Sequence, residues 1–398
     1  MTILEVKRYK SIDSIEIELR PLTVLIGPPA GGKSNLLEAI ALVGMVGRLA
    51  DAEAQYSSED AFCANEPSPR ELLRIVDPLE AFPWLDYREP AEATLRGESA
   101  ATVHMEPGSD SLLLEARLAG LSLRAAIPLA EEGGKRCLLE PARLGKLLAK
   151  GRRRRGVIEE VDEKALDMVT ENAPRARLYG YERYSIERRI GEVTRCSRPV
   201  CREPRTILSE TAANLAPIAS KSPLALRRLH TWLHDELGAE IEVLVRRHGI
   251  HELLFFSNQV EIPPHLVSDT ILRTLYYLLA LYTNTRHHRI HRAPTIILLE
   301  EPEARVFPYG FEVLAPEIAE AVEEGVYVAL TTHNGLLLSK LLDTLPEDRL
   351  AVYYIYQGPG GYTRAAPVPI HRLAEKMMLL EDLLVMKPAE VLHELGYT

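Results

Sequence analysis

The sequence predicts an α/β protein with a mixed sheet flanked by helices, and three observations support this class. Residues 22–26 form a continuous apolar run, which is typical of a parallel strand buried on both faces. A Gly- and Pro-rich loop and then a helical pattern follow it directly. Further on, apolar runs at 295–299 and 326–331 flank a helical pattern near 311–322. Strands that alternate with helices along a chain favour a parallel sheet.

Length and composition describe a globular chain. With 398 residues, of which 46% are hydrophobic and 26% charged, it is long enough for one large domain or two ordinary ones. Its apolar runs fall short of the roughly 18 residues that a membrane-spanning helix needs. The first residues lack the basic and apolar regions of a signal peptide. We therefore expect a cytoplasmic protein with no membrane partner.

The rarer residue types carry two further expectations. Only three glutamines and seven asparagines accompany abundant Glu and Arg, a bias typical of hyperthermophiles. Four cysteines are too few for a disulfide framework, and Cys63 and Cys137 are interpreted as ordinary thiols. Cys196 and Cys201 are close enough to form a loop disulfide, half of a metal site or two ordinary thiols.

Basic residues are concentrated in the middle of an acidic chain. The net charge is −10, yet residues 146–205 hold 16 Lys and Arg against 10 Asp and Glu. Clustered Arg side chains with interleaved tyrosines can bind phosphates and stack on bases, so DNA or RNA bound through residues 150–205 is one interpretation. A solvated insertion paired with its own acidic residues is the other. The residues concerned are Lys150, Arg152, Arg153, Arg154, Arg155, Arg183, Arg188, Arg189, Arg195, Arg198, Arg202 and Arg205, with Tyr179, Tyr181 and Tyr184.

The N-terminal section, expected over residues 1–145, alternates strand and helix patterns. Strands are recognised by short apolar or alternating runs, and helices by an apolar stripe with a period near 3.6 residues. In order, the patterns predict strands at 3–6, 15–19 and 22–26, a helix at 34–46, and a hairpin of 112–118 with 121–127.

The rest of the chain is expected to form an Arg-rich insertion with a helical lobe, residues 146–265, and a C-terminal section, residues 266–398. Residues 268–282 are almost all apolar, which predicts a buried helix. The other patterns predict a helix at 224–237, hairpins of 241–246 with 252–256 and of 350–356 with 362–366, and a terminal helix from about residue 371.

Residues 27–34 match the phosphate-loop motif G-x-x-x-x-G-K-S, between a buried strand and a helix. This context suits a nucleotide, because N–H groups of the loop and of the helix N-terminus point at its phosphates. Lys33 is expected to contact the β- and γ-phosphates of ATP, and Ser34 to bind Mg²⁺. The expected binding residues are Gly27, Pro28, Pro29, Ala30, Gly31, Gly32, Lys33, Ser34 and Asn35.

Acidic residues follow the apolar run at 295–299. The carboxyl ends of parallel strands share one edge of a sheet, so Glu300 and Glu301 should lie beside the phosphate loop. Glu300 would hold Mg²⁺ or its water, and Glu301 would orient and deprotonate the water that attacks the γ-phosphorus. A solvated acidic loop is the alternative.

His333 follows the strand expected at 326–331. From the same sheet edge, a histidine can donate to the γ-phosphate or to the attacking water and so sense the nucleotide state. A purely structural histidine is the alternative. Glu301, His333 and Lys33 are therefore the candidate catalytic residues.

The order of these motifs resembles the ABC-type ATPases of the SMC, RecF and OLD kind, and especially the AAA-type ATPases related to RecF and OLD. The resemblance covers both ends of the chain and is weaker in the middle. It implies a P-loop NTPase fold of ABC-ATPase type, with a helical lobe and an inserted basic segment. The matching segments are residues 9–12, 25–40 with the Walker A motif, 298–308 with the Walker B motif, and 330–337.

The resemblance also implies a signature segment at 267–273, with Ser268 at the start of a helix. In relatives this serine contacts the γ-phosphate of ATP bound to a second subunit, which implies an ATP-dependent homodimer. Helix N–H groups suit phosphate. A serine at this place can also be a plain N-cap.

The function implied is a Mg²⁺-dependent ATP switch that acts on DNA in repair or genome defence, with a separate effector protein as partner. Pro29, Thr270 and Arg305 depart from the family's usual residues, and Glu300 replaces its Asp. The extra methylene moves that carboxylate by about 1.5 Å, so slow hydrolysis is expected. A non-catalytic nucleotide-binding scaffold and, less favoured, a transporter-type ATPase subunit are the alternatives.

A run of Arg and His follows the apolar helix pattern. His287 and His291 are four residues apart and could share a metal, but no carboxylate or cysteine accompanies them. A solvated loop is therefore expected. The run comprises Arg286, His287, His288, Arg289, His291 and Arg292.

Overall fold

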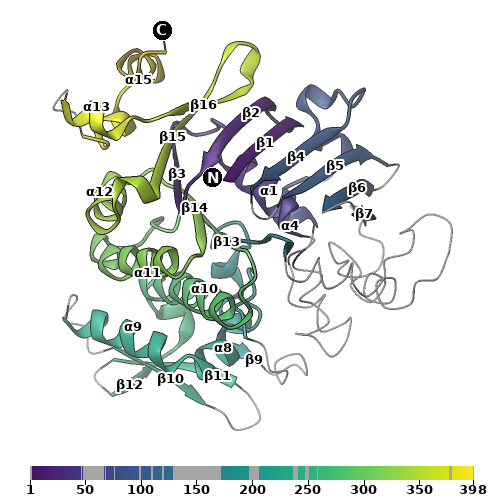
Figure 1. Cartoon of the computed structure of the whole chain (residues 1–398). Helices are drawn as coiled ribbons and strands as arrows, with labels where there is room; N and C mark the ends of the chain where they lie inside the picture. The colour runs from purple at the N-terminus through teal and green to yellow at the C-terminus, as the bar shows by residue number, and fades with distance from the viewer. Residues whose placement is uncertain are drawn as a thin grey trace.

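A computed structural model describes most of the chain, and the described residues form three sheets with helices packed between and beside them (Figure 1). The expected α/β class, with a mixed sheet flanked by helices, is confirmed. The described residues are 2–45, 47, 67, 69–75, 77–97, 100–108, 111–118, 121–128, 172–196, 206–235, 241–246, 251–257, 259–375 and 379–397.

The central sheet has the strand order β16-β15-β3-β14-β13-β8. Neighbouring strands are parallel, except that β16 is antiparallel to β15. Thr331 is paired with both Leu25 and Glu300, so β3, β14 and β13 end at the same edge. The strands are β3 (Leu22–Ile26), β8 (Arg175–Tyr179), β13 (Thr295–Glu300), β14 (Tyr327–Thr331), β15 (Leu350–Gln357) and β16 (Thr363–Pro367).

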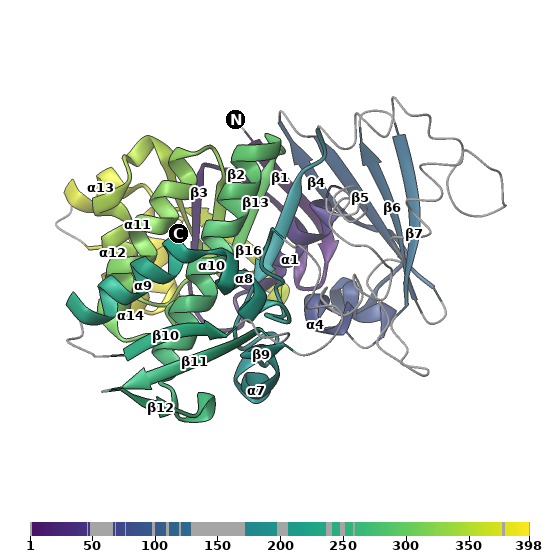
Figure 2. The ribbon, with the colours of Figure 1, turned by 90° about the horizontal axis from the view of Figure 1, so that it is seen from below.

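The two faces of this sheet are covered by different layers (Figures 1 and 2). Val24 packs into a core with α10, α11 and α12, whereas its neighbour Leu25 packs into a second core with α1 and the N-terminal sheet. Because successive side chains of a strand point to opposite faces, a strand covered on both is mostly apolar. The helices are α1 (Lys33–Val43), α10 (Asp269–His291), α11 (Phe311–Glu323) and α12 (Gly335–Thr344).

The N-terminal sheet is antiparallel, with the order β2-β1-β4-β5-β6-β7. Its last pair is the hairpin expected from alternation, in which Leu118 pairs with Leu121. Helix α1 contacts β1 and β4, so this sheet covers the helix that follows the phosphate loop. The elements are β1 (Thr2–Tyr9), β2 (Ile12–Leu19), α4 (Pro69–Leu73), η1 (Pro78–Ala81), η2 (Pro83–Leu85), β4 (Ala91–Arg96), β5 (Ala101–Pro107), β6 (Ser111–Leu118) and β7 (Leu121–Pro128).

A third, smaller sheet packs with the helices of the middle section. Its β10–β11 hairpin and helix α9 are the elements expected there. Cys196 lies in β9, but Cys63, Cys137 and Cys201 lie outside the described residues, as does any pairing between Cys196 and Cys201. The elements are η3 (Ile186–Arg189), α7 (Ile190–Val193), β9 (Arg195–Cys196), α8 (Leu215–Lys221), α9 (Pro223–Asp235), β10 (Ile241–Arg246), β11 (His251–Ser257), β12 (Val260–Ile262) and η5 (Pro264–Leu266).

The prediction of a loop at residues 286–292 is wrong. Helix α10 continues to His291, so the Arg and His residues form its last turns. Burial explains the extra length, because Asn284 and His287 still face the core. The rings of His287 and His291 pack with centroids 4.3 Å apart. The described residues include no group of three or more His, Cys, Asp and Glu side chains that could hold a metal.

The C-terminal end contains more helices than the sequence predicts. Helix α12 was not expected, and the described residues after β16 form three short helices in place of the single terminal helix. Pro388, which has no N–H to donate, begins a new helix instead of continuing an earlier one. None of the described helices combines the length and apolar character that crossing a bilayer requires. The remaining elements are η6 (Pro308–Gly310), η7 (Glu347–Arg349), η8 (Pro359–Gly361), α13 (Ile370–Glu375), α14 (Asp382–Val385) and α15 (Pro388–Leu395).

Candidate functional site

The phosphate loop turns sharply between β3 and α1. Gly27 and Gly32 have φ angles of +134° and +101°, in the region that glycine adopts without steric cost. A Cβ atom on Gly27 would lie 2.1 Å from the carbonyl oxygen of Ile355. Strand β15 therefore packs directly against the loop, and residue 27 must be glycine.

Lys33 lies across this loop. Its Nζ donates to the carbonyl oxygens of Gly27 and Pro28, both at 2.9 Å. Burial lowers the pKa of Lys33 to about 8, although Glu301 and Glu303 favour its charged form. A buried ammonium of this kind gains stability from an anionic ligand that replaces the lost water.

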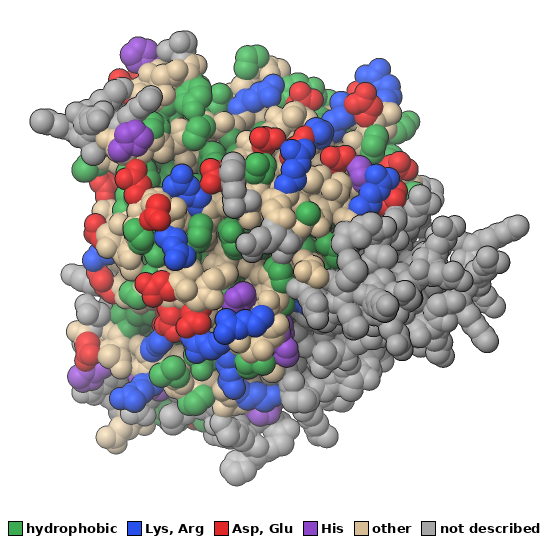
Figure 3. Space-filling model, viewed as in Figure 1, with side chains coloured by type: hydrophobic (Ala, Val, Ile, Leu, Met, Phe, Trp, Pro, Cys, Tyr) green, Lys and Arg blue, Asp and Glu red, His purple; other side chains and the backbone are tan. Residues whose placement is uncertain are grey.

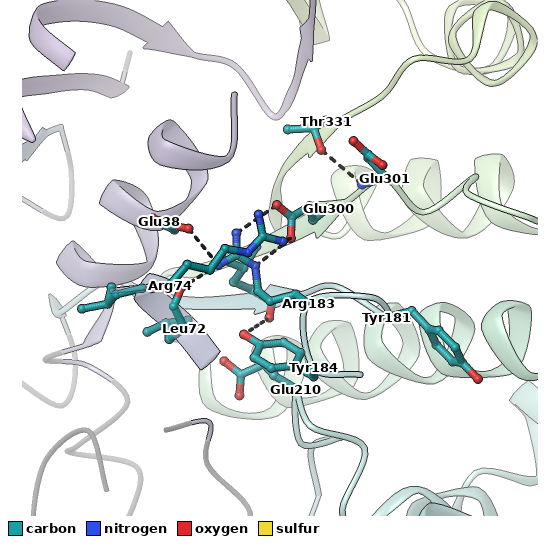
Figure 4. Close-up of polar contacts among 12 residues, drawn as sticks. Glu38, Leu72, Arg74, Tyr181, Arg183, Tyr184, Glu210, Glu300, Glu301 and Thr331 are labelled. Atoms are coloured by element: carbon teal, nitrogen blue, oxygen red, sulfur yellow. Dashed lines mark hydrogen bonds and ion pairs between the residues drawn. The ribbon is translucent and has the colours of Figure 1, made fainter. Parts of the chain in front are cut away.

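Glu301 and His333 meet at the acidic end of β13. Glu301 has a φ of +45°, which is rare outside glycine, and its N–H points to the Oγ1 of Thr331 at 3.1 Å (Figure 4). Its Oε1 lies 3.5 Å from the Nε2 of His333. His333 lowers the pKa of Glu301, and Lys33 contributes in the same direction, so Glu301 is ionised at neutral pH. Strained backbone of this kind is concentrated at functional sites.

Glu303 holds the segment that carries His333. Its buried carboxylate accepts from the Oγ1 of Thr332 at 2.7 Å and from the N–H of His333 at 2.8 Å. Burial raises the pKa of Glu303, although these two hydrogen bonds oppose the shift. Glu303 therefore fixes the backbone at Thr332 and His333. The sequence indicates it only as a third acid in the run that begins at Glu300.

Arg183, in the loop after β8, pairs with Glu300. Its Nε and Nη2 donate to the two oxygens of Glu300 at 2.6 and 2.9 Å, and its Nη1 donates to Glu38 on α1 at 2.8 Å (Figure 4). Arg74 adds a contact to Glu300 at 3.0 Å. Burial alone would raise the pKa of Glu300, but the two guanidinium groups outweigh burial and lower it. Glu300 is therefore ionised and held on both oxygens.

Glu38 completes this cluster beneath the phosphate loop. It also accepts from the Nζ of Lys10 at 2.5 Å and from the hydroxyl of Tyr9 at 3.2 Å. Arg183 and Glu38 are both buried away from water, so each charge is stabilised by the opposite charge of its partner. The cluster joins α1, the end of β8 and the end of β13. Sequence analysis missed Glu38, Arg74 and this role of Arg183.

The predicted base-stacking role of the tyrosines at 179–184 is wrong. Tyr179, Tyr181 and Tyr184 expose at most 1% of their surface, because they pack in the core. Arg183 is occupied by its two carboxylates. On the face in Figure 3, the described acidic and basic side chains are intermixed. Residues 150–155 and Arg198, Arg202 and Arg205 lie outside the described residues.

Ser268 is exposed at the N-terminal end of α10, and its side chain makes no capping hydrogen bond. The first turn of the helix contacts residues beyond the acidic strand end, since the Oγ1 of Thr270 donates to the carbonyl oxygen of Arg305 at 3.2 Å. One turn later, the Nη2 of the buried Arg273 lies 2.6 Å from the Oε1 of Glu182. The helix is thus joined to the loop that carries Arg183. Among the described residues, no hydrogen bond joins the Ser268 side chain to the phosphate loop of its own chain.

Comparisons with known proteins identify the fold. No protein-family model and no curated protein matches the chain. A solved SMC head bound to the C-winged helix domain of ScpA matches with a TM-score of 0.50 and 14% identity, over 94% of this chain and 99% of that one. An SMC head domain from Thermotoga maritima has a TM-score of 0.39 at 13% identity, covering 92% and 98%. An Smc head with an extended coiled coil, bound to the C-terminal domain of ScpA derived from Pyrococcus furiosus, has 0.44 at 13%, covering 95% and 99%.

The motif order and the first of these comparisons agree. The chain has the ABC-type ATPase fold of SMC heads, as the sequence predicts. Two statements stay predictions: that the chain is most similar to ATPases related to RecF and OLD, and that it comes from a hyperthermophile.

Proposed function

We propose that the chain is an ATPase that binds ATP at the phosphate loop, hydrolyses it slowly, and joins a second copy when ATP is bound. The observation that carries the proposal is that the Oε1 of Glu301 lies 3.5 Å from the Nε2 of His333, at the end of the strand β13. The same carboxylate favours the charged form of Lys33 in the phosphate loop. A positive charge beside the phosphates and a carboxylate that can activate water both suit phosphoanhydride hydrolysis.

Each of these side chains has a role in the proposed reaction. Glu301, ionised because its pKa is lowered, accepts a proton from the attacking water. His333 donates to the γ-phosphate or orients Glu301, and Glu303 fixes the backbone of His333. Lys33 and the N–H groups of α1 neutralise the charge that develops on the phosphate oxygens.

Ser34 and Glu300 are suitable donors for Mg²⁺. A hydroxyl and a carboxylate are hard oxygen donors, which Mg²⁺ prefers, and Ser34 lies close enough to Glu300 to help lower its pKa. When bound there, the ion would neutralise charge between the β- and γ-phosphates. Because Arg183 and Arg74 already hold both oxygens, Glu300 is a weaker donor than a free carboxylate. That competition favours slow turnover.

An ATP-dependent homodimer is proposed because Ser268 is exposed at the start of a 23-residue helix, without a capping bond. N–H groups at such a helix start suit a phosphate of the second copy. The pairs Arg273–Glu182 and Arg183–Glu300 connect this helix to the nucleotide site. Binding of DNA or RNA through the basic residues within 150–205 and a role in repair or genome defence are part of the same proposal. The SMC head compared above is bound to a domain of ScpA, which supports a protein partner here.

A non-catalytic nucleotide-binding scaffold is the second candidate. The observation in its favour is the occupation of Glu300 by Arg183 and Arg74. The two candidates agree on ATP binding and differ in turnover.

Phosphate release from ATP separates them. We expect the wild-type chain to release phosphate with Mg²⁺, and chelation of the metal to stop the release. Lys33→Met should lower turnover by about 10²–10³-fold, the usual effect of removing one group that stabilises transition-state charge. ATP binding without any phosphate release would select the scaffold, and absence of ATP binding would overturn both candidates.

A further inference from the structure

Trp84 and Tyr362 form an exposed aromatic pair. Trp84 exposes 72% of its surface and has a φ of 52°, which is unusual for so large a residue. Its ring meets that of Tyr362 edge to face, with centroids 6.3 Å apart. A Cβ atom on Gly361 would lie 3.0 Å from the Trp84 ring, so the indole lies against the tip of the β15–β16 hairpin. Strained backbone of this kind is concentrated at functional sites, which makes this pair a candidate contact for a ligand.

This pair lies next to the phosphate loop. Thr363, which follows Tyr362, has its Oγ1 2.6 Å from the Oγ of Ser11. Ser11 in turn accepts from the Nδ2 of Asn35, in the first turn of α1, at 2.7 Å. Two hydrogen bonds therefore connect the start of α1 to the residue beside Tyr362.

The pair and the catalytic residues lie on opposite sides of the loop. The phosphate loop follows β3, which lies between β14 and β15 in the sheet. His333 and Glu301 follow β14 and β13 on one side, and Tyr362 lies between β15 and β16 on the other. A nucleotide whose γ-phosphate faces Glu301 would extend its nucleoside toward β15 and the aromatic pair.

We propose that Trp84 stacks on the purine base of the bound nucleotide, with Tyr362 fixing the indole from its edge. This inference rests on the proposed nucleotide site and adds the residue that recognises the base. Stacking suits any base that presents a π face, and an indole offers a large one. Sequence motifs do not reveal this role, because Trp84 lies far along the chain from the phosphate loop.

Tryptophan fluorescence tests the proposal directly. The chain has two tryptophans, and Trp232 is 97% buried, so a Trp232→Phe background isolates the signal of Trp84. ADP and inorganic tripolyphosphate are titrated separately, since only ADP has a base. We expect ADP to quench Trp84 and tripolyphosphate to bind without quenching. Trp84→Ala should weaken ADP binding by about 5- to 150-fold in calorimetry, leave tripolyphosphate binding unchanged, and be rescued by Trp84→Phe.

The outcomes separate this inference from the proposed function. If both ligands bind and Trp84→Ala changes neither affinity, the phosphate site stands and the stacking role is overturned. If Trp84→Ala weakens both ligands equally, Trp84 supports the loop and does not recognise a base. If the wild-type chain binds neither ligand, the nucleotide site itself is wrong and the inference fails with it.

Discussion

Replacing Arg183 with methionine should lower the free energy of unfolding by about 3–5 kcal/mol, the usual cost of breaking a buried ion pair from one side. The substitution removes the charge that pairs with Glu300 and Glu38 and leaves both carboxylates buried without it. Denaturation in urea measures the loss. Arg188→Met is a matched control on an exposed arginine of the same segment and should change stability by less than about 0.5 kcal/mol.

The stability that Arg183→Met loses should depend on pH. Arg183 helps to hold the pKa of Glu300 below its ordinary value of 4.5, so the stabilisation from this pair is complete above that pH and is lost as the pH falls through the lowered pKa. The gap between wild type and Arg183→Met should therefore narrow in acid. Equal stability of Arg183→Met and Arg188→Met at neutral pH would show that the buried cluster does not stabilise the fold.

Replacing Glu301 with glutamine should lower kcat for ATP hydrolysis by about 10²–10⁴-fold, the usual contribution of a general base. An amide of the same shape cannot accept the proton of the attacking water. ATP affinity should change little, because the binding groups are Lys33 and the loop N–H groups. Phosphate release in single-turnover conditions, together with calorimetric ATP binding, measures the two effects separately.

Glu261→Gln is the control for this variant. Glu261 is exposed on β12, and the change should leave kcat as it is in the wild type. A Glu301→Gln enzyme with wild-type kcat would assign the general base to another group.

The parts of the fold that sequence analysis predicts are those with strong local patterns. Residues 22–26 are apolar except for Thr23 because both faces of β3 are buried, and residues 27–34 need their glycines for the loop. Neither feature depends on distant residues. The sequence could therefore predict that the phosphate loop and the end of β13 are neighbours, because the carboxyl ends of parallel strands lie at one edge of a sheet.

Other parts depend on contacts between segments far apart in the chain. Arg183 belongs to an Arg-rich segment whose composition suggests nucleic-acid binding. Its partners in the structure, Glu300 and Glu38, lie 117 and 145 positions away in the chain. Helix α10 is longer than its apolar pattern because His287 is covered by tertiary packing. Strand β8 has two arginines in five residues, so its sequence does not predict a buried strand. It is buried because it pairs with β13.

The measurement that most directly tests the proposed switch is the light-scattering mass of Glu301→Gln with and without Mg-ATP. Blocking the water-activation step should trap the ATP-bound state. The account predicts 44.5 kDa without ATP and twice that mass with it, and Ser268→Arg should prevent the doubling. A Glu301→Gln chain that binds ATP but keeps a mass of 44.5 kDa would contradict the ATP-dependent dimer.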